Sequence, residues 1–273
     1  MDAFADPCYA PAMNPGQDSP TITGAQTVDR ACELLRAVAR CGAPGARIVD
    51  LCGATGLSRP TAHRILRSLA AAGLLRQVPQ TRRYHLGSGL FELGLAAPNP
   101  IAAFPRVREV VEQLAAATQD TVYLMLRSYD DVVCAWRAEG AYPIKANVVA
   151  MGDRRPLGAS AAGICILASL PPDEAEALIA ANAPALARFC KLDAAALRAH
   201  VAAVRPSGHL VGRDLVMEGV AAIGMAVPAP HGRPYLALSV SAIGARIPEA
   251  RVAALVQQLR AAVNDIAAAI AAG

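Results

Sequence analysis

The sequence is poor in lysine and in aromatic residues, and it has no long apolar run. Only two of its 26 basic residues are lysines, and aromatic residues make up 4% of its 273 residues. No apolar stretch approaches the roughly 20 residues that a transmembrane helix needs. The N-terminus also lacks the basic segment and apolar core of a secretory signal. We therefore expect a cytoplasmic protein without a membrane partner.

Motifs for metal binding, nucleotide binding and nucleophilic catalysis are missing as well. The seven cysteines are dispersed without a C-x-x-C pair, and no histidine lies near a cysteine at metal-ligand spacing. The sequence contains neither a G-x-S-x-G nucleophile elbow nor a phosphate-binding glycine loop. Cys134 and Cys165 lie in apolar runs, where a thiol normally packs as an inert hydrophobe. This pattern predicts reduced cysteines, no cofactor, no metal site and no catalytic residue.

Positive charge, in contrast, is present and unevenly distributed. The net charge is +4, but residues 21–97 contain ten arginines against four acidic residues, a net charge of +6. Residues 1–20 carry −3 and residues 98–273 carry +1. A chain of this length suits two modest domains. A basic N-terminal third favours contact with the phosphates of DNA.

One stretch of the basic region, residues 57–69, has the pattern of a DNA-recognition helix. An apolar face recurs at helical spacing and consists of Ala62, Ile65, Leu66 and Leu69. The opposite face and its rim are polar and basic, with Arg59, Pro60, Thr61, His63, Arg64, Arg67 and Ser68. Ser58 is a candidate N-cap, and Pro60 fits only the first turn of a helix. On this stretch alone, a basic surface helix is the alternative interpretation.

The neighbouring segments predict a winged helix-turn-helix. A first helix is expected over 27–40, and a short helix over 48–55 ends in a glycine turn. The apolar stripe of the first helix consists of Val28, Ala31, Leu34, Leu35 and Val38. Two strands, 74–78 and 82–86, follow the recognition helix and form a basic hairpin, for which an ordinary β-hairpin is the alternative. In a winged helix-turn-helix, the recognition helix enters the major groove and the hairpin, or wing, meets phosphate or the minor groove.

The remaining sequence predicts a second domain of α+β type. We expect a disordered tail at 1–22, the DNA-binding domain at 23–87, a linker helix within 88–100 and the second domain at 101–273. Its helices are predicted at 101–117, 159–169, 173–181, 193–204 and from 248 onward. Its strands are predicted at 121–127, 132–137, 144–151, 220–227 and 235–241. Helices flanking a mostly antiparallel sheet are typical of an α+β fold.

Five motifs in this order resemble those of the IclR family of bacterial transcriptional regulators. They are GLSRPTAHRIL (56–66) with GLL (73–75), RYHLG (83–87), GDRRPLGAS (152–160), EGVAAIG (218–224) and ALSVS (237–241). The resemblance implies an α+β protein in which a linker helix joins the winged helix-turn-helix domain to a GAF-like effector-binding domain. It also implies a homodimer or a dimer of dimers. The expected partners are double-stranded operator DNA, a small-molecule effector and further copies of the chain.

Candidate DNA-binding residues come from the recognition helix and the wing. Arginine can bond a guanine edge with two hydrogen bonds, and threonine can contact a thymine methyl group, so we expect base readers among the helix arginines and Thr61. Other side chains hold phosphate, which positions the protein without reading sequence. The candidates are Ser58, Arg59, Pro60, Thr61, His63, Arg64, Arg67, Arg76, Arg82 and Arg83, with His63 expected to pack at the rim.

The resemblance places the effector site at the start of the small-residue helix and on the late strands. Its implied residues are Met151, Gly158, Ala159, Ser160, Asp214, Ala222, Ser239 and Ser241. Backbone N–H groups at a helix start can bind a carboxylate. For the two strand serines, a polar strand face is an equally open interpretation. Arg154 and Arg155 either pair with an acidic ligand or lie in a solvated turn.

The chain departs from the family pattern within this expected site. Gly158 stands where the family often has histidine, and Ala222 stands where it often has cysteine. An acidic pair is kept only in part, at Asp214. The effector is therefore expected to be a small metabolite, an organic acid or an intermediate of aromatic catabolism, whose identity the sequence leaves open. Two alternatives are a residual enzymatic activity of the second domain and DNA binding that does not respond to a ligand.

Overall fold

The computed structural model describes residues 26–42, 44–96, 103–186, 189–190, 192–229 and 234–272. The chain divides into two compact units, residues 1–97 and 98–273. The predicted tail at 1–22 lies outside the described residues. No helix in the described ranges combines the length and the apolar character required to span a bilayer.

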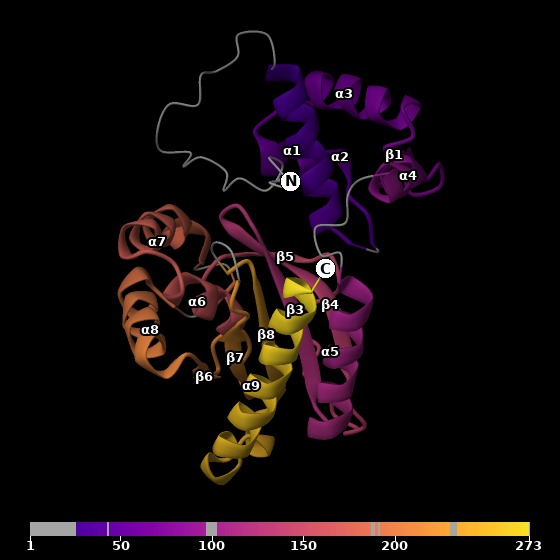
Figure 1. Cartoon of the computed structure of the whole chain (residues 1–273). Helices are drawn as coiled ribbons and strands as arrows, with labels where there is room; N and C mark the ends of the chain where they lie inside the picture. Colours follow the sequence, from indigo (N-terminus) through magenta and orange to yellow (C-terminus); the bar gives the residue numbers. More distant parts are fainter. Residues whose placement is uncertain are drawn as a thin grey trace, which may run out of the picture. The chain divides into compact units, whose positions relative to one another are not determined.

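The N-terminal unit has the predicted order of elements (Figure 1). Helices α1 (Gln26–Arg40), α2 (Ile48–Thr55) and α3 (Arg59–Ala71) precede the strands β1 (Leu75–Gln77) and β2 (Tyr84–Leu86), and α4 (Ser88–Ala96) follows. β1 and β2 pair antiparallel, and a bridge joins Ala46 to Tyr84 of β2. The predicted winged helix-turn-helix is confirmed.

The core of this unit follows the predicted apolar stripes with one exception. The whole apolar face of α3 is buried, and it packs with Leu34 of α1 and Leu51 of α2. Val28 does not fit the prediction, because its side chain is 63% exposed. It lies in the first turn of α1, and the hydrophobic cluster of this unit begins one turn later, at Ala31 and Leu34.

The second unit is built on a six-stranded sheet in the order β5-β4-β3-β8-β7-β6. Every neighbouring pair is antiparallel. The strands are β3 (Thr121–Ser128), β4 (Asp131–Glu139), β5 (Arg154–Pro156), β6 (Leu210–Arg213), β7 (Val220–Ala226) and β8 (Leu236–Ile243). Central β8 is buried over seven of its eight residues, so both faces of the sheet are covered. The predicted α+β fold is confirmed.

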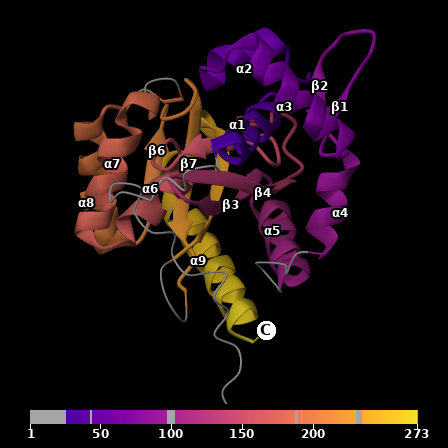
Figure 2. The same ribbon diagram turned by 90° about the horizontal axis from the view of Figure 1, so that it is seen from above.

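Alternate residues of the central strands face two separate cores. Val122 and Leu124 of β3 pack with α5 (Phe104–Thr118) and α9 (Glu249–Ala271), which run side by side. Tyr123 and Met125, on the opposite face of β3, pack with α6 (Ala161–Ala168), α7 (Pro172–Leu186) and α8 (Ala194–Ser207). Figure 2 shows the second unit from above, with α7 and α8 on the side away from α5.

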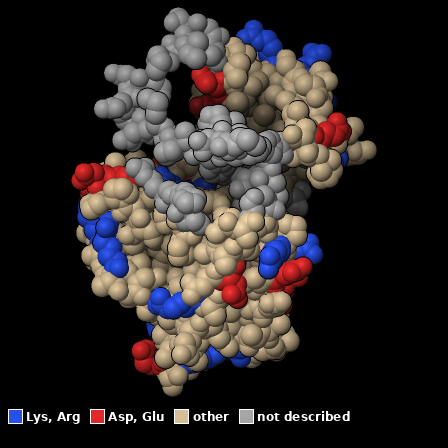
Figure 3. All heavy atoms as spheres, in the orientation of Figure 1, with Lys and Arg blue, Asp and Glu red and all other residues tan. Residues whose placement is uncertain are grey.

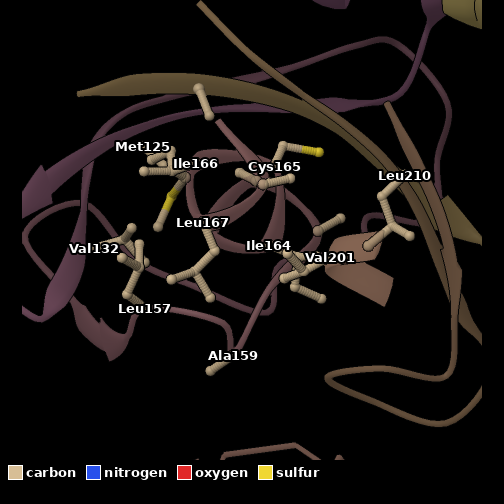
Figure 4. Close-up of a cluster of buried hydrophobic side chains, with 14 of the residues drawn as sticks. Met125, Val132, Leu157, Ala159, Ile164, Cys165, Ile166, Leu167, Val201 and Leu210 are labelled. Carbon is tan, nitrogen blue, oxygen red and sulfur yellow. The ribbon is translucent and has the colours of Figure 1, made fainter. Parts of the chain in front are cut away.

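Helix α6 is the buried centre of one of these cores. All eight of its residues are buried, and its side chains meet Met125, Val132, Val201 and Leu210 from four neighbouring elements (Figure 4). The helix approaches β7 at Gly224, where a Cβ atom would lie 2.6 and 2.7 Å from the backbone C and O of Ala161. Only glycine permits this approach, which places the start of α6 directly against the sheet.

The structure corrects three predictions for the second unit. Residues 144–151 form no strand, and five of their backbone polar groups bond side chains instead, those of Tyr123, Arg137, Asp153 and Arg155. Arg154 and Arg155 lie in β5, paired with β4, and not in a solvated turn. Strand β6 was not predicted, because its four residues are too few to show an alternating pattern.

Candidate DNA-binding surface and ligand pocket

The outward face of α3 carries exposed basic side chains. Arg59, His63, Arg64 and Arg67 are all exposed, and Pro60 occupies the first turn as predicted. In Figure 3, basic side chains appear on the N-terminal unit at the end where α3 lies in Figure 1. The geometry gives a rigid helix whose buried face is apolar and whose free face is cationic, which suits insertion into a major groove.

Ser58 occupies the N-cap position of α3 but does not cap the helix with its side chain. Its hydroxyl instead donates to Oγ1 of Thr61 at 2.9 Å. This bond fixes the Thr61 side chain on the first turn of the helix. The two predicted residues therefore form one polar unit at the N-terminal end of α3, where helix-turn-helix proteins contact bases.

The three arginines of the wing occupy different environments. Arg76 on β1 is exposed, and Arg82 is exposed near the tip with a left-handed φ of 53°. The guanidinium of Arg83 is turned back toward the body of the unit, where it donates to the carbonyl of Gly45 at 2.8 Å. Arg83 thus anchors the wing to the loop before α2, and Arg76 and Arg82 are the wing arginines that face solvent.

A pocket opens in the second unit between the sheet and the start of α6. The space in the pocket and at its mouth amounts to about 550 Å³ with open solvent included, and the centre of a water molecule can occupy about 40 Å³ of it. Strands β3, β7 and β8 contribute one side, and segments 148–149 and 212–220 contribute others. The lining residues are Tyr123, Met125, Val148, Val149, Arg155, Ala159, Ser160, Ala161, Gly212, Leu215, Val216, Val220, Ala222, Ser239 and Ser241. A mostly apolar pocket with a few polar groups is typical of small-molecule sites.

Five of the predicted effector residues line this pocket, namely Ala159, Ser160, Ala222, Ser239 and Ser241. The other three do not. Met151 is 56% exposed, and the carboxylate of exposed Asp214 accepts a 2.7 Å hydrogen bond from the Gly219 N–H within its own turn. At Gly158, with φ of 107°, a Cβ atom would meet Cδ2 of Leu197 at 2.8 Å, so this position faces the core beside α8.

The serines of the pocket differ in how their hydroxyls are satisfied. Ser160 is the N-cap of α6, and its Oγ accepts from the Gly163 N–H at 3.1 Å. Ser239 and Ser241 are only 6% and 4% exposed. Within the described ranges, no hydrogen bond joins either of these two hydroxyls to another residue. Neither oxygen is among the buried polar atoms that lack a partner, so each hydroxyl reaches the open space of the pocket and is available to a molecule there.

Sequence reasoning missed Tyr123 as a lining residue and left Arg155 undecided. Tyr123 lies across from Ser239 on the neighbouring strand. Its hydroxyl donates to the Ala146 carbonyl at 2.6 Å and accepts from the Val148 N–H at 3.1 Å. Burial raises the pKa of Tyr123 above its ordinary value, so the phenol is neutral and keeps both bonds. Alternation along β3 was the one signal that could have placed Tyr123 on the pocket face.

Two buried cysteines, Cys134 and Cys165, lie in the core around α6 and are expected to be unreactive. Burial raises the pKa of Cys134 and of Cys165 to about 12. Both therefore remain neutral thiols at physiological pH, and a neutral thiol is a poor nucleophile. This agrees with their predicted role as packing residues.

The comparisons with known proteins cover both units. The profile of the IclR helix-turn-helix domain matches residues 27–79, and that of the C-terminal domain of bacterial IclR transcriptional regulators matches residues 101–268. The HTH-type transcriptional repressor AllR of Salmonella typhimurium is 26% identical over 260 residues, which cover 94% of each chain. The glycerol operon regulatory protein of Streptomyces griseus is 30% identical over 248 residues, 90% of this chain and 94% of that protein.

Solved structures show the same fold. An IclR homologue of Microbacterium hydrocarbonoxydans, solved in complex with 4-hydroxybenzoate, superposes with a TM-score of 0.67 at 22% identity. The match covers 90% of this chain and all of the other. With the exposed basic recognition helix, the wing and the pocket in the second unit, the chain belongs to the IclR family of DNA-binding bacterial transcriptional regulators.

Proposed function

We propose that this regulator binds operator DNA as a homo-oligomer in the cytoplasm and responds to a small organic acid held in the pocket of its second unit. The observation that carries the proposal is the pair of hydroxyls of Ser239 and Ser241, which line the pocket and have no protein partner among the described residues. A ligand that bonds them replaces water at both positions. Each such hydrogen bond is worth about 0.5–1.5 kcal/mol.

DNA binding is assigned to α3 and the wing. Arg59, Thr61, Arg64 and Arg67 are the proposed base readers, because arginine and threonine suit base edges. Ser58 positions Thr61 through the bond between their hydroxyls. Pro60 and His63 lie on the same exposed face, and Arg76 and Arg82 are proposed to contact backbone phosphates.

A second copy of the chain is the proposed partner of α4. None of its nine residues is buried, and Phe91, Leu93 and Leu95 are 69%, 61% and 71% exposed. An apolar helix of this kind needs a covering surface. A two-fold dimer would cover α4 and would also present two copies of α3 to a roughly palindromic operator.

An organic acid is the proposed effector because the pocket provides hydrogen-bond donors and a cation but no acidic side chain among its lining residues. The solved homologue bound to 4-hydroxybenzoate supports the aromatic acids as one class to test. The proposed contacts are the hydroxyls of Ser160, Ser239 and Ser241, with Ala159 and Ala222 shaping the wall.

Two measurements test this proposal in sequence. Sequencing of genomic fragments retained by the purified protein identifies the operator, and fluorescence anisotropy then gives its affinity with and without each compound of a metabolite panel. A compound at about 100 times its dissociation constant stabilises the protein by roughly 2.7 kcal/mol, which a thermal-shift screen detects. A compound that stabilises the protein and changes operator affinity supports the proposal. If none in a broad panel does both, the ligand response is refuted and DNA binding alone remains.

A further inference from the structure

Arg155 is the charged residue of the pocket lining, and its surroundings differ from those of its neighbour Arg154. Arg154 is neutralised by Asp131, with Nε and Nη2 at 3.2 and 3.1 Å from one carboxylate oxygen. Arg155 has no carboxylate partner among the described residues. It stacks 5.0 Å from the ring centroid of Phe189 and donates Nη2 to the backbone carbonyl of Val148 at 3.1 Å. A guanidinium that is half-buried and bonded to a neutral carbonyl has unused capacity for an anion.

The acceptor of this bond belongs to a segment that forms part of the pocket. We call residues 146–150 the pocket wall. Its backbone is irregular and is held by side chains of the sheet. Tyr123 makes the two bonds described above, to Ala146 and Val148. Arg137 donates to the carbonyl of Val149 at 3.2 Å. A fourth side chain, that of Asp153, accepts from the Ala150 N–H at 2.9 Å. Of these four residues Tyr123 and Arg155 line the pocket, whereas Arg137 and Asp153 do not.

We propose that Arg155 is the anchor for a carboxylate ligand and that the Val148 carbonyl occupies this anchor in the free protein. A carboxylate accepts a stronger, charge-assisted hydrogen bond from a guanidinium than a neutral carbonyl does. In this proposal the entering acid takes the Nη2 donor that Val148 holds and also bonds the unused donors of the guanidinium. The wall then loses its bond to Arg155 and keeps those to Tyr123, Arg137 and Asp153. Ligand binding is thereby coupled to the backbone of residues 146–150.

This inference rests on the proposed ligand response and restricts the chemical class of the ligand. A single cation in a largely apolar pocket suits one negative charge, because a second carboxylate would be desolvated without a partner. Ser239 and Ser241 offer bonds to one further polar group. The ligand class is thus a small monocarboxylate with an apolar body and one additional hydroxyl or carbonyl group.

Binding of matched acids and amides tests the anchor. The probes are hexanoate, benzoate and 4-hydroxybenzoate with their primary amides, titrated calorimetrically into the full-length wild type, Arg155→Gln and Arg137→Gln. We expect the wild type to prefer a bound acid over its amide by about tenfold or more, the value of a charge-assisted bond. Arg155→Gln should abolish this preference. Arg137→Gln, which also loosens the wall, should keep it. The ratio of acid to amide affinity is a readout that a purely structural role of Arg155 would leave unchanged.

The other outcomes separate this inference from the proposed function. Equal binding of acid and amide, or an unchanged preference in Arg155→Gln, overturns the anchor. If neutral compounds of the wider panel bind and shift operator affinity while the acids do not bind, the ligand response stands and the anchor is wrong. If no probe and no panel compound binds, both are rejected.

Hydrogen exchange tests the wall without any ligand. Tyr123→Phe removes the hydroxyl that bonds Ala146 and Val148, so amide exchange of residues 146–150 should accelerate relative to the wild type. Tyr129→Phe is the matched control, because Tyr129 is 65% exposed on the β3–β4 turn. A bound acid should change exchange in the same residues of the wild type. Unaltered exchange in Tyr123→Phe, or a bound acid without effect on the wall, refutes the coupling.

Discussion

The candidate binding side chains of the two units differ in how far they are exposed to solvent. On α3 the arginines are exposed to water, which DNA phosphates and bases replace on binding. In the pocket, the largely buried residues Ser239 and Ser241 present their hydroxyls to the pocket space. Substitutions on α3 should therefore alter binding without altering stability, whereas substitutions in the pocket act on groups that the fold already encloses.

Replacing Arg64 with alanine should weaken operator binding while the melting temperature stays constant. A side chain that reads a base contributes about 1–3 kcal/mol, so the expected loss is roughly tenfold or more at one base position. Fluorescence anisotropy on the operator and on single-base variants measures it. Arg36→Ala, an exposed arginine of α1, is the control. Equal affinities of wild type and Arg64→Ala would remove α3 from the proposed interface.

Replacing Ser239 or Ser241 with alanine should weaken effector binding and spare DNA binding in the absence of ligand. Each substitution removes one hydrogen bond, worth about 0.5–1.5 kcal/mol, and leaves the buried volume nearly unchanged. Isothermal titration of both variants checks the loss. Wild-type effector affinity in both variants would show that the serines belong only to the polar face of a strand.

The two buried thiols make stability depend on alkaline pH. Burial raises the pKa of Cys134 and Cys165 to about 12 from the ordinary 9.0. Between these values the unfolded chain has lost thiol protons that the folded chain keeps, so the free energy of unfolding falls as pH rises above about 9. Urea denaturation across pH 8–11 measures this slope. The slope should flatten in Cys134→Ala with Cys165→Ala, and an identical slope in that double variant would contradict the assignment.

Elements with a local apolar pattern could be predicted from the sequence, and those defined by distant partners could not. The face of α3 and the strands β3, β4, β7 and β8 follow from spacing alone. Residues 144–151 include the β-formers Ile144, Val148 and Val149. Several of their backbone groups, however, bond the side chains of Tyr123, Arg137, Asp153 and Arg155. Hydrogen bonds to side chains this far away in sequence cannot be predicted from the pattern of neighbouring residues.

The candidate site shows the same division. The family resemblance places Ser239 and Ser241 in the effector site, and their alternation on β8 puts both on the same face of the sheet. Gly158 does not line the pocket because it faces Leu197, nearly forty residues away in sequence. Asp214 does not line it either, and its carboxylate accepts a hydrogen bond from the Gly219 N–H of its own turn. Arg155 reaches the pocket only through the pairing of β5 with β4, whereas alternation along β3 indicates the face of Tyr123 but not the pocket that it lines.

Helix α4 provides a test at the scale of one element. Leu93→Asp places a charge on the proposed contact between two copies and should shift the protein from dimer to monomer in sedimentation velocity. Operator affinity should fall in parallel, because one copy reads only half of a palindrome. Met217→Asp, another exposed apolar position at 53%, is the control. An unchanged oligomeric state in Leu93→Asp would exclude α4 from the dimer contact.

For the whole molecule, the two units must be coupled if the ligand regulates DNA binding. Thermodynamic linkage requires that the factor by which a ligand changes operator affinity equals the factor by which operator DNA changes ligand affinity. Both factors can be measured, by anisotropy with saturating ligand and by calorimetry with saturating operator. Couplings of about 1–3 kcal/mol are typical. Unequal apparent factors would show that the two measurements compare different species, for example different oligomeric states at different protein concentrations.

The register of the central sheet has a consequence for how such regulators diversify. Ser239 lies between Tyr123 and Gly224, and Ser241 lies between Thr121 and Ala222. The residues interleaved with them, such as Val122 and Val240, belong to the opposite core beneath α5 and α9. Evolution can therefore exchange the recognised metabolite by altering every second residue of three strands while the intervening residues preserve the fold.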